Sequence, residues 1–298
     1  MGLSLILLLP NSFLKQACED AGVEALGYLP KCADVEIPSR HLGLSLDEDF
    51  CFEEFADRVA ELVEKHVNIN RLLELTKPVA TAVVPISAGR HIYKREPSFP
   101  IAVACDPAFN FVYEANIRYL HHLGEVTYFS PLADTSLPDA GFVYLPGGYP
   151  ELYLAALSAN RQMLQSIRRY VESGGKLLAE CGGMMYLCDE IRDKNGYVYP
   201  MAGVLHQSAT MENMKLRLGY RTLLYNETRL KGHEFHYSRL VEQQNPLPSC
   251  AVAYTAKGVE TDTPLYHYKN VWAGYTHLYW ADPVGNEWFT KFVIDGNT

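Results

Sequence analysis

The chain has 298 residues, of which 48% are hydrophobic and 20% are charged, a balance typical of a globular protein with a sizeable core. Its net charge of −9 and its lack of any lysine- or arginine-rich run exclude the basic footprint of a nucleic-acid-binding protein. The seven cysteines form no Cys-x-x-Cys pair, which argues against a zinc site or a disulfide framework and favours a reducing cytoplasm.

The N-terminal part begins with ten residues that are mostly apolar but too few to span a bilayer, and they lack the basic region and cleavage site of a signal peptide. We therefore expect a buried strand there and no membrane segment. The elements predicted in this part are a strand over 3–9, a helix over 12–21, a short strand over 25–29, a loop with Pro38 and Gly43, and a helix over about 51–66. These strands are too few for an independent α/β domain, so residues 1–77 are interpreted as a fragment of a domain or an appendage.

Residues 78–100 are mixed in character, aperiodic and marked by prolines, as expected of a linker to a second part over 101–298. In that second part, short apolar runs alternate with helical patterns, which predicts a parallel sheet with helices on both faces. The strands are expected at 101–104, 126–129, 142–145 and 176–180, and the helices at about 111–123 and 159–173. From about residue 200, β-branched and aromatic runs predict antiparallel strands added at one side, at 218–225, 250–255 and 271–280, before a closing helix over 286–294.

The most informative motif is a cysteine at the end of an apolar run, in Lys176-Leu177-Leu178-Ala179-Glu180-Cys181-Gly182-Gly183. A strand that ends in a sharp turn, followed by glycines that open a helix, is typical of a nucleophile elbow. Cysteine suits such a turn because its thiolate attacks carbonyl carbon well once a helix N-terminus and a nearby histidine lower its pKa. A buried structural cysteine is the alternative for this residue type, and it is the interpretation we give to Cys188.

A second glycine-rich loop, Pro146-Gly147-Gly148-Tyr149-Pro150-Glu151, follows a predicted strand and precedes a helix. Glycines there allow backbone N–H groups to approach a ligand closely, although they would also suit a tight turn without a ligand. Loops at the carboxyl ends of parallel strands meet at one rim of a sheet, so we expect this loop to lie near Cys181.

A thiolate nucleophile needs a base, and ten histidines are available. His277 lies in a strand-like aromatic run near the end of the chain, an order common where a base comes from a later strand or loop. His233 and His236 compete with it. These two flank Glu234 with a spacing that suits a metal, but no third ligand at motif spacing accompanies them, and we predict no metal site. Spacing alone does not choose among the three histidines.

Residues 101–298 resemble the glutamine amidotransferase domain of the cobyrinate a,c-diamide synthase family, which acts in cobalamin biosynthesis. The resemblance implies a class I glutamine amidotransferase-like, flavodoxin-like α/β fold with no cofactor in this domain. It is carried by Asp106–Tyr113, Phe129–Asp134, Leu145–Glu151, Ala179–Gly183, Gly232–Ser238 and Tyr275–His277, which cover most of that domain.

The resemblance implies that Cys181 is the nucleophile and that His277, rather than the other two histidines, raises its nucleophilicity. It also implies that backbone N–H groups near Gly148 and Gly182 form an oxyanion hole and, with Gly147, bind glutamine. The ammonia released from a cysteine thioester would amidate the a and c carboxylates of a cobyrinate-type tetrapyrrole.

The first part of the chain also resembles this family, because residues 37–44 look like a motif near the end of its ATP-dependent synthetase domain, a P-loop fold akin to dethiobiotin synthetase. The chain has no Gly-x-x-x-x-Gly-Lys-Ser/Thr sequence to cradle ATP and Mg²⁺, which the full synthetase reaction requires. We therefore expect residues 1–77 to be the C-terminal remnant of that domain, either because the coding sequence is truncated or because a separate chain carries the P-loop half.

One position departs from the pattern of many class I amidotransferases, which carry a glutamate two residues after the histidine. Tyr279 stands there, so an orienting acid must come from elsewhere or the site works as a dyad. Two alternative functions are a nickel-sirohydrochlorin or other tetrapyrrole a,c-diamide synthase and a catalytically idle remnant or binding subunit.

Overall fold

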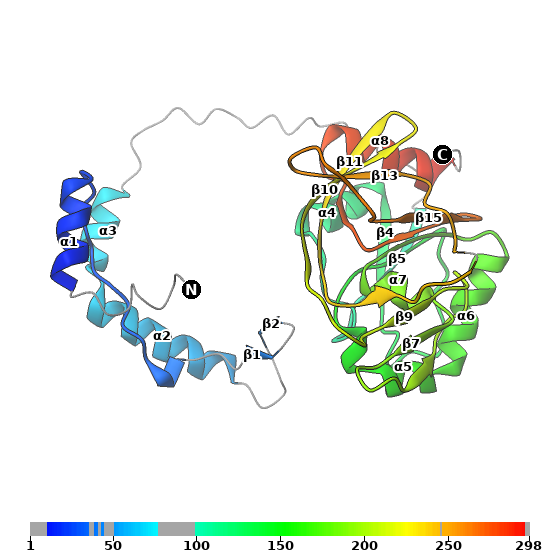
Figure 1. Cartoon of the computed structure of the whole chain (residues 1–298), viewed down its shortest axis with the longest axis horizontal. Coiled ribbons are helices and arrows are strands. Elements are labelled where there is room, and N and C mark those ends of the chain that lie inside the picture. The colour runs from blue at the N-terminus through cyan, green and yellow to red at the C-terminus, as the bar shows by residue number, and fades with distance from the viewer. Residues whose placement is uncertain are drawn as a thin grey trace. The chain divides into compact units, whose positions relative to one another are not determined.

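The computed structural model describes residues 11–35, 39–40, 43–44, 51–76, 99–244 and 246–295. The chain divides into two units, residues 1–90 and 91–298 (Figure 1). The strand expected over 3–9, Pro38 and nearly all of the stretch 78–100 lie outside the described residues. None of the helices in the described part of the chain is long and apolar enough to cross a membrane.

The first unit consists of a few separate helices and short strands, and its described residues form no hydrophobic core. Its elements are α1 (Asn11–Asp20), η2 (Ala33–Val35), β1 (Ser39–Arg40), β2 (Gly43–Leu44), α2 (Phe52–His66) and α3 (Ile69–Leu75). The helices expected over 12–21 and 51–66 are present, whereas the strand expected over 25–29 amounts to a single bridge between Gly27 and Val67. None of the side chains described between residues 13 and 76 is buried, so these residues do not form a core by themselves.

The main sheet of the second unit has six strands in the order β15-β16-β6-β5-β3-β4. Its strands are β3 (Phe99–Ala104), β4 (Gly124–Phe129), β5 (Phe142–Leu145), β6 (Lys176–Glu180), β15 (Leu265–Tyr268) and β16 (Val271–Gly274). All neighbouring pairs are parallel except β15 with β16, which confirms the predicted parallel sheet. Every residue of β5 and β16 is buried, as expected for continuous apolar runs in a sheet that is covered on both faces.

Helices connect and cover these strands. They are α4 (Glu114–Leu123), η3 (Pro150–Leu152), α5 (Leu154–Ala159), α6 (Arg161–Glu172), α7 (Gly182–Leu187), α8 (Pro283–Thr290) and the π-helical turn η4 (Lys291–Asp295). One alternating set of strand residues, with Phe142 and Leu178, packs in a cluster with residues of α4 and α8. The opposite set, with Val143 and Leu177, is equally buried, so both faces are covered as predicted.

Two helix starts differ from the prediction. Helix α8 begins at Pro283 rather than at 286, because the Asp282 side chain accepts the Gly285 N–H at 2.7 Å and proline suits the first helical position. Helix α4 begins at Glu114 rather than at 111, because the Phe111 N–H donates to the Gly147 carbonyl at 3.0 Å and leaves that residue in a loop.

Two further sheets complete the unit. An antiparallel sheet has the order β14-β13-β10-β11-β17 and consists of β10 (Arg217–Tyr225), β11 (Thr228–His236), β13 (Val252–Thr255), β14 (Glu260–Thr261) and β17 (His277–Tyr279). A smaller sheet has the order β12-β9-β7-β8, with β7 (Glu190–Arg192), β8 (Val198–Pro200), β9 (Ser208–Thr210) and β12 (Arg239–Leu240). The antiparallel strands expected at 218–225 and 250–255 are present.

The expectation of one antiparallel strand over 271–280 is wrong. The chain forms two strands there, and they belong to different sheets: β16 runs parallel to β6 in the main sheet, and β17 runs antiparallel to β11. An apolar and aromatic run predicts burial, and all of β16 and all of β17 except Tyr279 are buried. The pattern therefore gives no sign of the break at Tyr275 and Thr276. This crossing takes the chain from the strand beside the elbow to the strand that carries His277.

Candidate active site

Cys181 occupies a strained turn between β6 and α7. Its backbone has φ 48° and ψ −106°, a positive φ that non-glycine residues rarely adopt and that costs on the order of 1–3 kcal/mol. The Cys181 N–H donates to the Gly274 carbonyl at 2.8 Å, and the Cys181 carbonyl accepts from the Met185 N–H at 3.0 Å. The elbow predicted from the sequence is therefore present, with the side chain 6% exposed.

The glycine-rich loop lies directly on the start of α7. A Cβ atom added at Gly182 would lie 2.7 Å from Pro150 Cδ and 3.2 Å from the Gly148 nitrogen. Glycine is needed at position 182 because any side chain would push this loop away from the elbow. Gly148 itself has φ 156°. The two glycine motifs, far apart in the sequence, thus meet beside Cys181.

His277 contacts the same loop from the other side. A Cβ atom added at Gly147 would lie 2.2 Å from His277 Cε1, so the imidazole rests against bare backbone at that glycine. The His277 side chain is 4% exposed, and its Nδ1 has no hydrogen-bond partner among the described residues. The loop therefore touches both the elbow and the histidine, and the five residues predicted from the sequence lie in one site.

The surroundings of the His277 imidazole favour its neutral form. Burial and, to a smaller extent, charge repulsion from His233 and His236 lower its pKa to about 3. Its ring stacks on His233 with centroids 5.0 Å apart, and it packs edge-to-face with Phe111, whose ring centroid lies 4.5 Å from its own. A neutral imidazole can accept a proton, which a protonated one cannot.

The two competing histidines do not form a metal site. His233 and His236 are three residues apart on β11, so their side chains point to opposite faces of the sheet. His233 pairs with His277 in the strand register and hydrogen-bonds the Tyr113 hydroxyl. His236 stacks on Tyr275 at 3.8 Å. Among the described residues, no cluster of three or more His, Cys, Asp or Glu side chains could hold a metal ion.

The surroundings of Cys181 favour the protonated thiol, contrary to the expectation of a lowered pKa. Burial raises its pKa well above the usual range, and the carboxylates of Glu151, Glu180 and Glu234 raise it further, while a hydrogen bond from the Gly182 N–H opposes them. A thiol in this environment becomes a thiolate only when a base takes its proton as the reaction proceeds.

A polar residue for which no role was predicted holds the strand with His277 in place. Asn116 on α4 is fully buried; its Nδ2 donates to the Leu278 carbonyl at 2.8 Å, and its Oδ1 accepts the Trp280 N–H at 3.1 Å. The only sequence signal was a polar side chain beside Ile117 on the apolar face of the helix.

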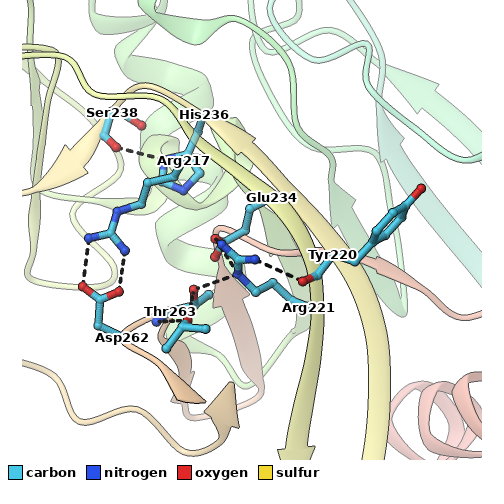
Figure 2. Close-up of polar contacts among 9 residues, drawn as sticks. Arg217, Tyr220, Arg221, Glu234, His236, Ser238, Asp262 and Thr263 are labelled. Carbon is cyan, nitrogen blue, oxygen red and sulfur yellow. Dashed lines mark hydrogen bonds and ion pairs between the residues drawn. The ribbon is translucent and has the colours of Figure 1, made fainter. Parts of the chain in front are cut away.

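A buried ion pair lies on the same sheet (Figure 2). Glu234 is 1% exposed and pairs with Arg221 at 2.8 Å. The Arg221 guanidinium also donates to the Tyr220 carbonyl at 3.0 Å and to the Thr263 hydroxyl at 3.4 Å. This pair compensates the Glu234 charge, and the Arg221 bond to Thr263 ties β10 and β11 to the chain two residues before β15.

Residues 100–284 match the family described as the CobB/CobQ-like glutamine amidotransferase domain. The chain is 37% identical over 277 residues to a hydrogenobyrinate a,c-diamide synthase of Pseudomonas aeruginosa, covering 90% of this chain and 60% of that protein. It is 35% identical over 283 residues to a cobyrinate a,c-diamide synthase of Clostridium acetobutylicum, covering 91% and 61%.

Among solved structures, one of PurLQS from Thermotoga maritima aligns with 66% of this chain and 96% of its own chain, at 17% identity and a TM-score of 0.44. The chain spans about 60% of the length of the curated relatives it matches. The family match covers the elbow, the glycine-rich loop and His277, and the chain belongs to the CobB/CobQ-like glutamine amidotransferase domain family.

Proposed function

We propose that this chain hydrolyses glutamine and releases ammonia by way of a thioester on Cys181. The observation that carries the proposal is the position of the glycine-rich loop, which touches Gly182 beside the nucleophile and the neutral His277 imidazole at once. A nucleophile, a base and backbone N–H groups in one place are what acyl transfer from an amide requires.

In the proposed reaction His277 takes the thiol proton as the Cys181 sulfur attacks the amide carbon of glutamine. The tetrahedral intermediate collapses to a thioester when the protonated imidazole gives its proton to the departing nitrogen, which leaves as ammonia. Neutral His277 then takes a proton from water, whose oxygen attacks the thioester and releases glutamate and the thiol. The low pKa of His277 keeps the imidazole unprotonated before each attack, which is the state a base needs.

The oxyanion of each tetrahedral intermediate needs N–H donors, and we assign these to the loop around Gly147 and Gly148 and to Gly182. The Gly148 N–H donates to no backbone oxygen among the described residues, and Gly182 is the first residue of α7, whose N–H has no partner within the helix. The Gly182 N–H also acts to lower the pKa of the Cys181 thiol, as expected of a donor beside the sulfur. Donors positioned before the reaction stabilise developing charge without reorganisation.

The acceptor we propose is a cobyrinate-type tetrapyrrole whose a and c carboxylates are amidated, after the names of the relatives. That reaction needs ATP and Mg²⁺, and this sequence has no P-loop motif while its described residues have no acidic metal cluster, so we derive no step through either. We propose that residues 1–77 are the C-terminal part of a synthetase domain, that 78–100 link it to the amidotransferase domain, and that a separate chain carrying the P-loop half acts with it in the cytoplasm.

The proposal is tested by measuring ammonia release from glutamine with the purified full chain. Replacing Cys181 by Ala should abolish the release, because no other group can form the thioester. Cys188→Ala is the matched control, since that thiol is also buried, at the other end of α7, and should keep the activity. Retained hydrolysis in Cys181→Ala would disprove the assignment.

A further inference from the structure

Glu180 is a buried carboxyl group to which the proposed reaction gives no task. Its side chain is 2% exposed, and no cation lies within ion-pair distance of it among the described residues. Both of its oxygens are used: Oε2 accepts the Tyr144 hydroxyl at 2.6 Å, and Oε1 accepts the Leu278 N–H at 3.0 Å. Burying a carboxyl group costs free energy, so its presence here indicates that the two hydrogen bonds have a role in the site.

The two bonds reach the three elements that carry the site. Glu180 lies on β6 and directly precedes Cys181. Tyr144 lies on β5, three residues before Gly147 in the glycine-rich loop, and Leu278 directly follows His277 on β17. One side chain therefore links the strands leading to the nucleophile, to the loop and to the base.

The segment that crosses between the two sheets, residues 274–278, is hydrogen-bonded at each end to one of two consecutive residues, Glu180 and Cys181. The Gly274 carbonyl accepts the Cys181 N–H at 2.8 Å, and the Leu278 N–H donates to Glu180. Between these bonds the chain turns through Tyr275 and Thr276. Strand β17 is short and pairs only with β11, at the edge of its sheet, so the Glu180 carboxyl replaces a neighbouring strand at the residue beside the histidine.

We propose that Glu180 is a positioning residue, whose bonds to the Leu278 N–H and the Tyr144 hydroxyl fix the placement of His277 and the glycine-rich loop relative to Cys181. This inference rests on the proposed hydrolysis of glutamine. Glu180 acts on His277 through the backbone and not through the imidazole, since His277 Nδ1 has no hydrogen-bond partner among the described residues. Tyr279 stands two residues after the histidine, so no acid at that position can hold His277 in place. Glu180 fills this role instead.

The test compares Glu180→Gln with Glu180→Asp in the full chain, measuring kcat and KM for glutamine hydrolysis. Glutamine keeps the shape: its oxygen accepts the Leu278 N–H, and its NH₂ group donates to the Tyr144 oxygen. Burial raises the pKa of Glu180 to about 7, so the neutral amide also resembles the protonated acid. Aspartate keeps the charge but is one methylene too short to reach both partners.

We expect Glu180→Gln to keep kcat within about 3-fold of the wild type, and Glu180→Asp to lose about 10²-fold in kcat with KM changed by less than about 3-fold, the loss typical of a displacement of about 1 Å. Leu164→Ala, in the buried side of α6, is the stability control. It should lower the melting temperature while kcat per folded molecule is unchanged, and near-ultraviolet circular dichroism measures the folded fraction.

Four results overturn the inference: an active aspartate variant, a glutamine variant as inactive as the aspartate one, a change confined to KM, or a loss that follows the folded fraction as in Leu164→Ala. If the wild-type chain releases no ammonia, the proposed function is wrong instead. The failure of the function is thus seen in the unsubstituted chain, whereas the failure of the Glu180 inference is seen only in the variants.

Discussion

Gly147→Ala tests whether the contact between the glycine-rich loop and the base matters for the reaction. The new methyl carbon would lie 2.2 Å from His277 Cε1 and 3.0 Å from Nδ1, where ordinary contact begins at 3.4 Å. Either the ring or the loop must therefore move by about 1.2 Å. The loop is the more firmly held of the two, because the Gly147 carbonyl accepts the Phe111 N–H at 3.0 Å, whereas Nδ1 of the imidazole has no hydrogen bond.

A displacement of that size at the base should reduce kcat for glutamine hydrolysis by about 10²-fold, which is about 2.7 kcal/mol of barrier. Overpacking should also cost about 1–3 kcal/mol of stability. Gly258→Ala is the control: a Cβ there meets nothing within 4 Å, and its φ of 77° strains alanine, so it should lower stability but leave kcat unchanged. A kcat for Gly147→Ala within 3-fold of the wild type would refute the proposed role of this contact.

Three further outcomes follow from buried groups around the site. Arg221→Met removes the partner of a carboxylate that is 1% exposed, Glu234, and should lower the free energy of unfolding in urea by about 3 kcal/mol, whereas a loss below 1 kcal/mol would contradict burial of the pair. Asn116→Ala removes the side-chain partner of the Leu278 carbonyl in β17 and of the Trp280 N–H just after it, and should cost roughly 2 kcal/mol in the same assay; an unchanged midpoint would count against that contact. Without glutamine, Cys181 should react more slowly with iodoacetamide at pH 8 than the exposed Cys105, as measured by mass spectrometry, because burial raises its pKa; faster labelling of Cys181 would contradict this.

The strands of the main sheet were the most predictable part of this fold. Strands β5 and β6 have the predicted bounds, since each is a short apolar run bounded by turn residues, and a strand buried on both faces has that pattern. Helix starts were less predictable. Where the chain leaves a strand or a loop for a helix, capping bonds such as that of Asp282 decide the first residue.

The candidate site divides in the same way between local and distant interactions. A strained turn after β6 was predictable because its cause, a strand followed at once by a helix, is local in the sequence. The meeting of Gly147 with His277 was not predictable from spacing, since it depends on the chain leaving β16 for a second sheet at Tyr275 and Thr276.

Glu180 shows why the sequence pattern could not predict its bonding partners. A charged residue at the end of an apolar strand is expected to lie in solvent, and here its burial is compensated by a hydroxyl 36 residues before it and an N–H 98 residues after it. Hydrogen bonds between residues so far apart produce no periodic pattern in the sequence. Glu180 itself was visible in the motif, directly before Cys181. A buried acid next to a motif residue therefore identifies which distant elements must stay aligned, and here they are the two that carry the base and the glycine-rich loop.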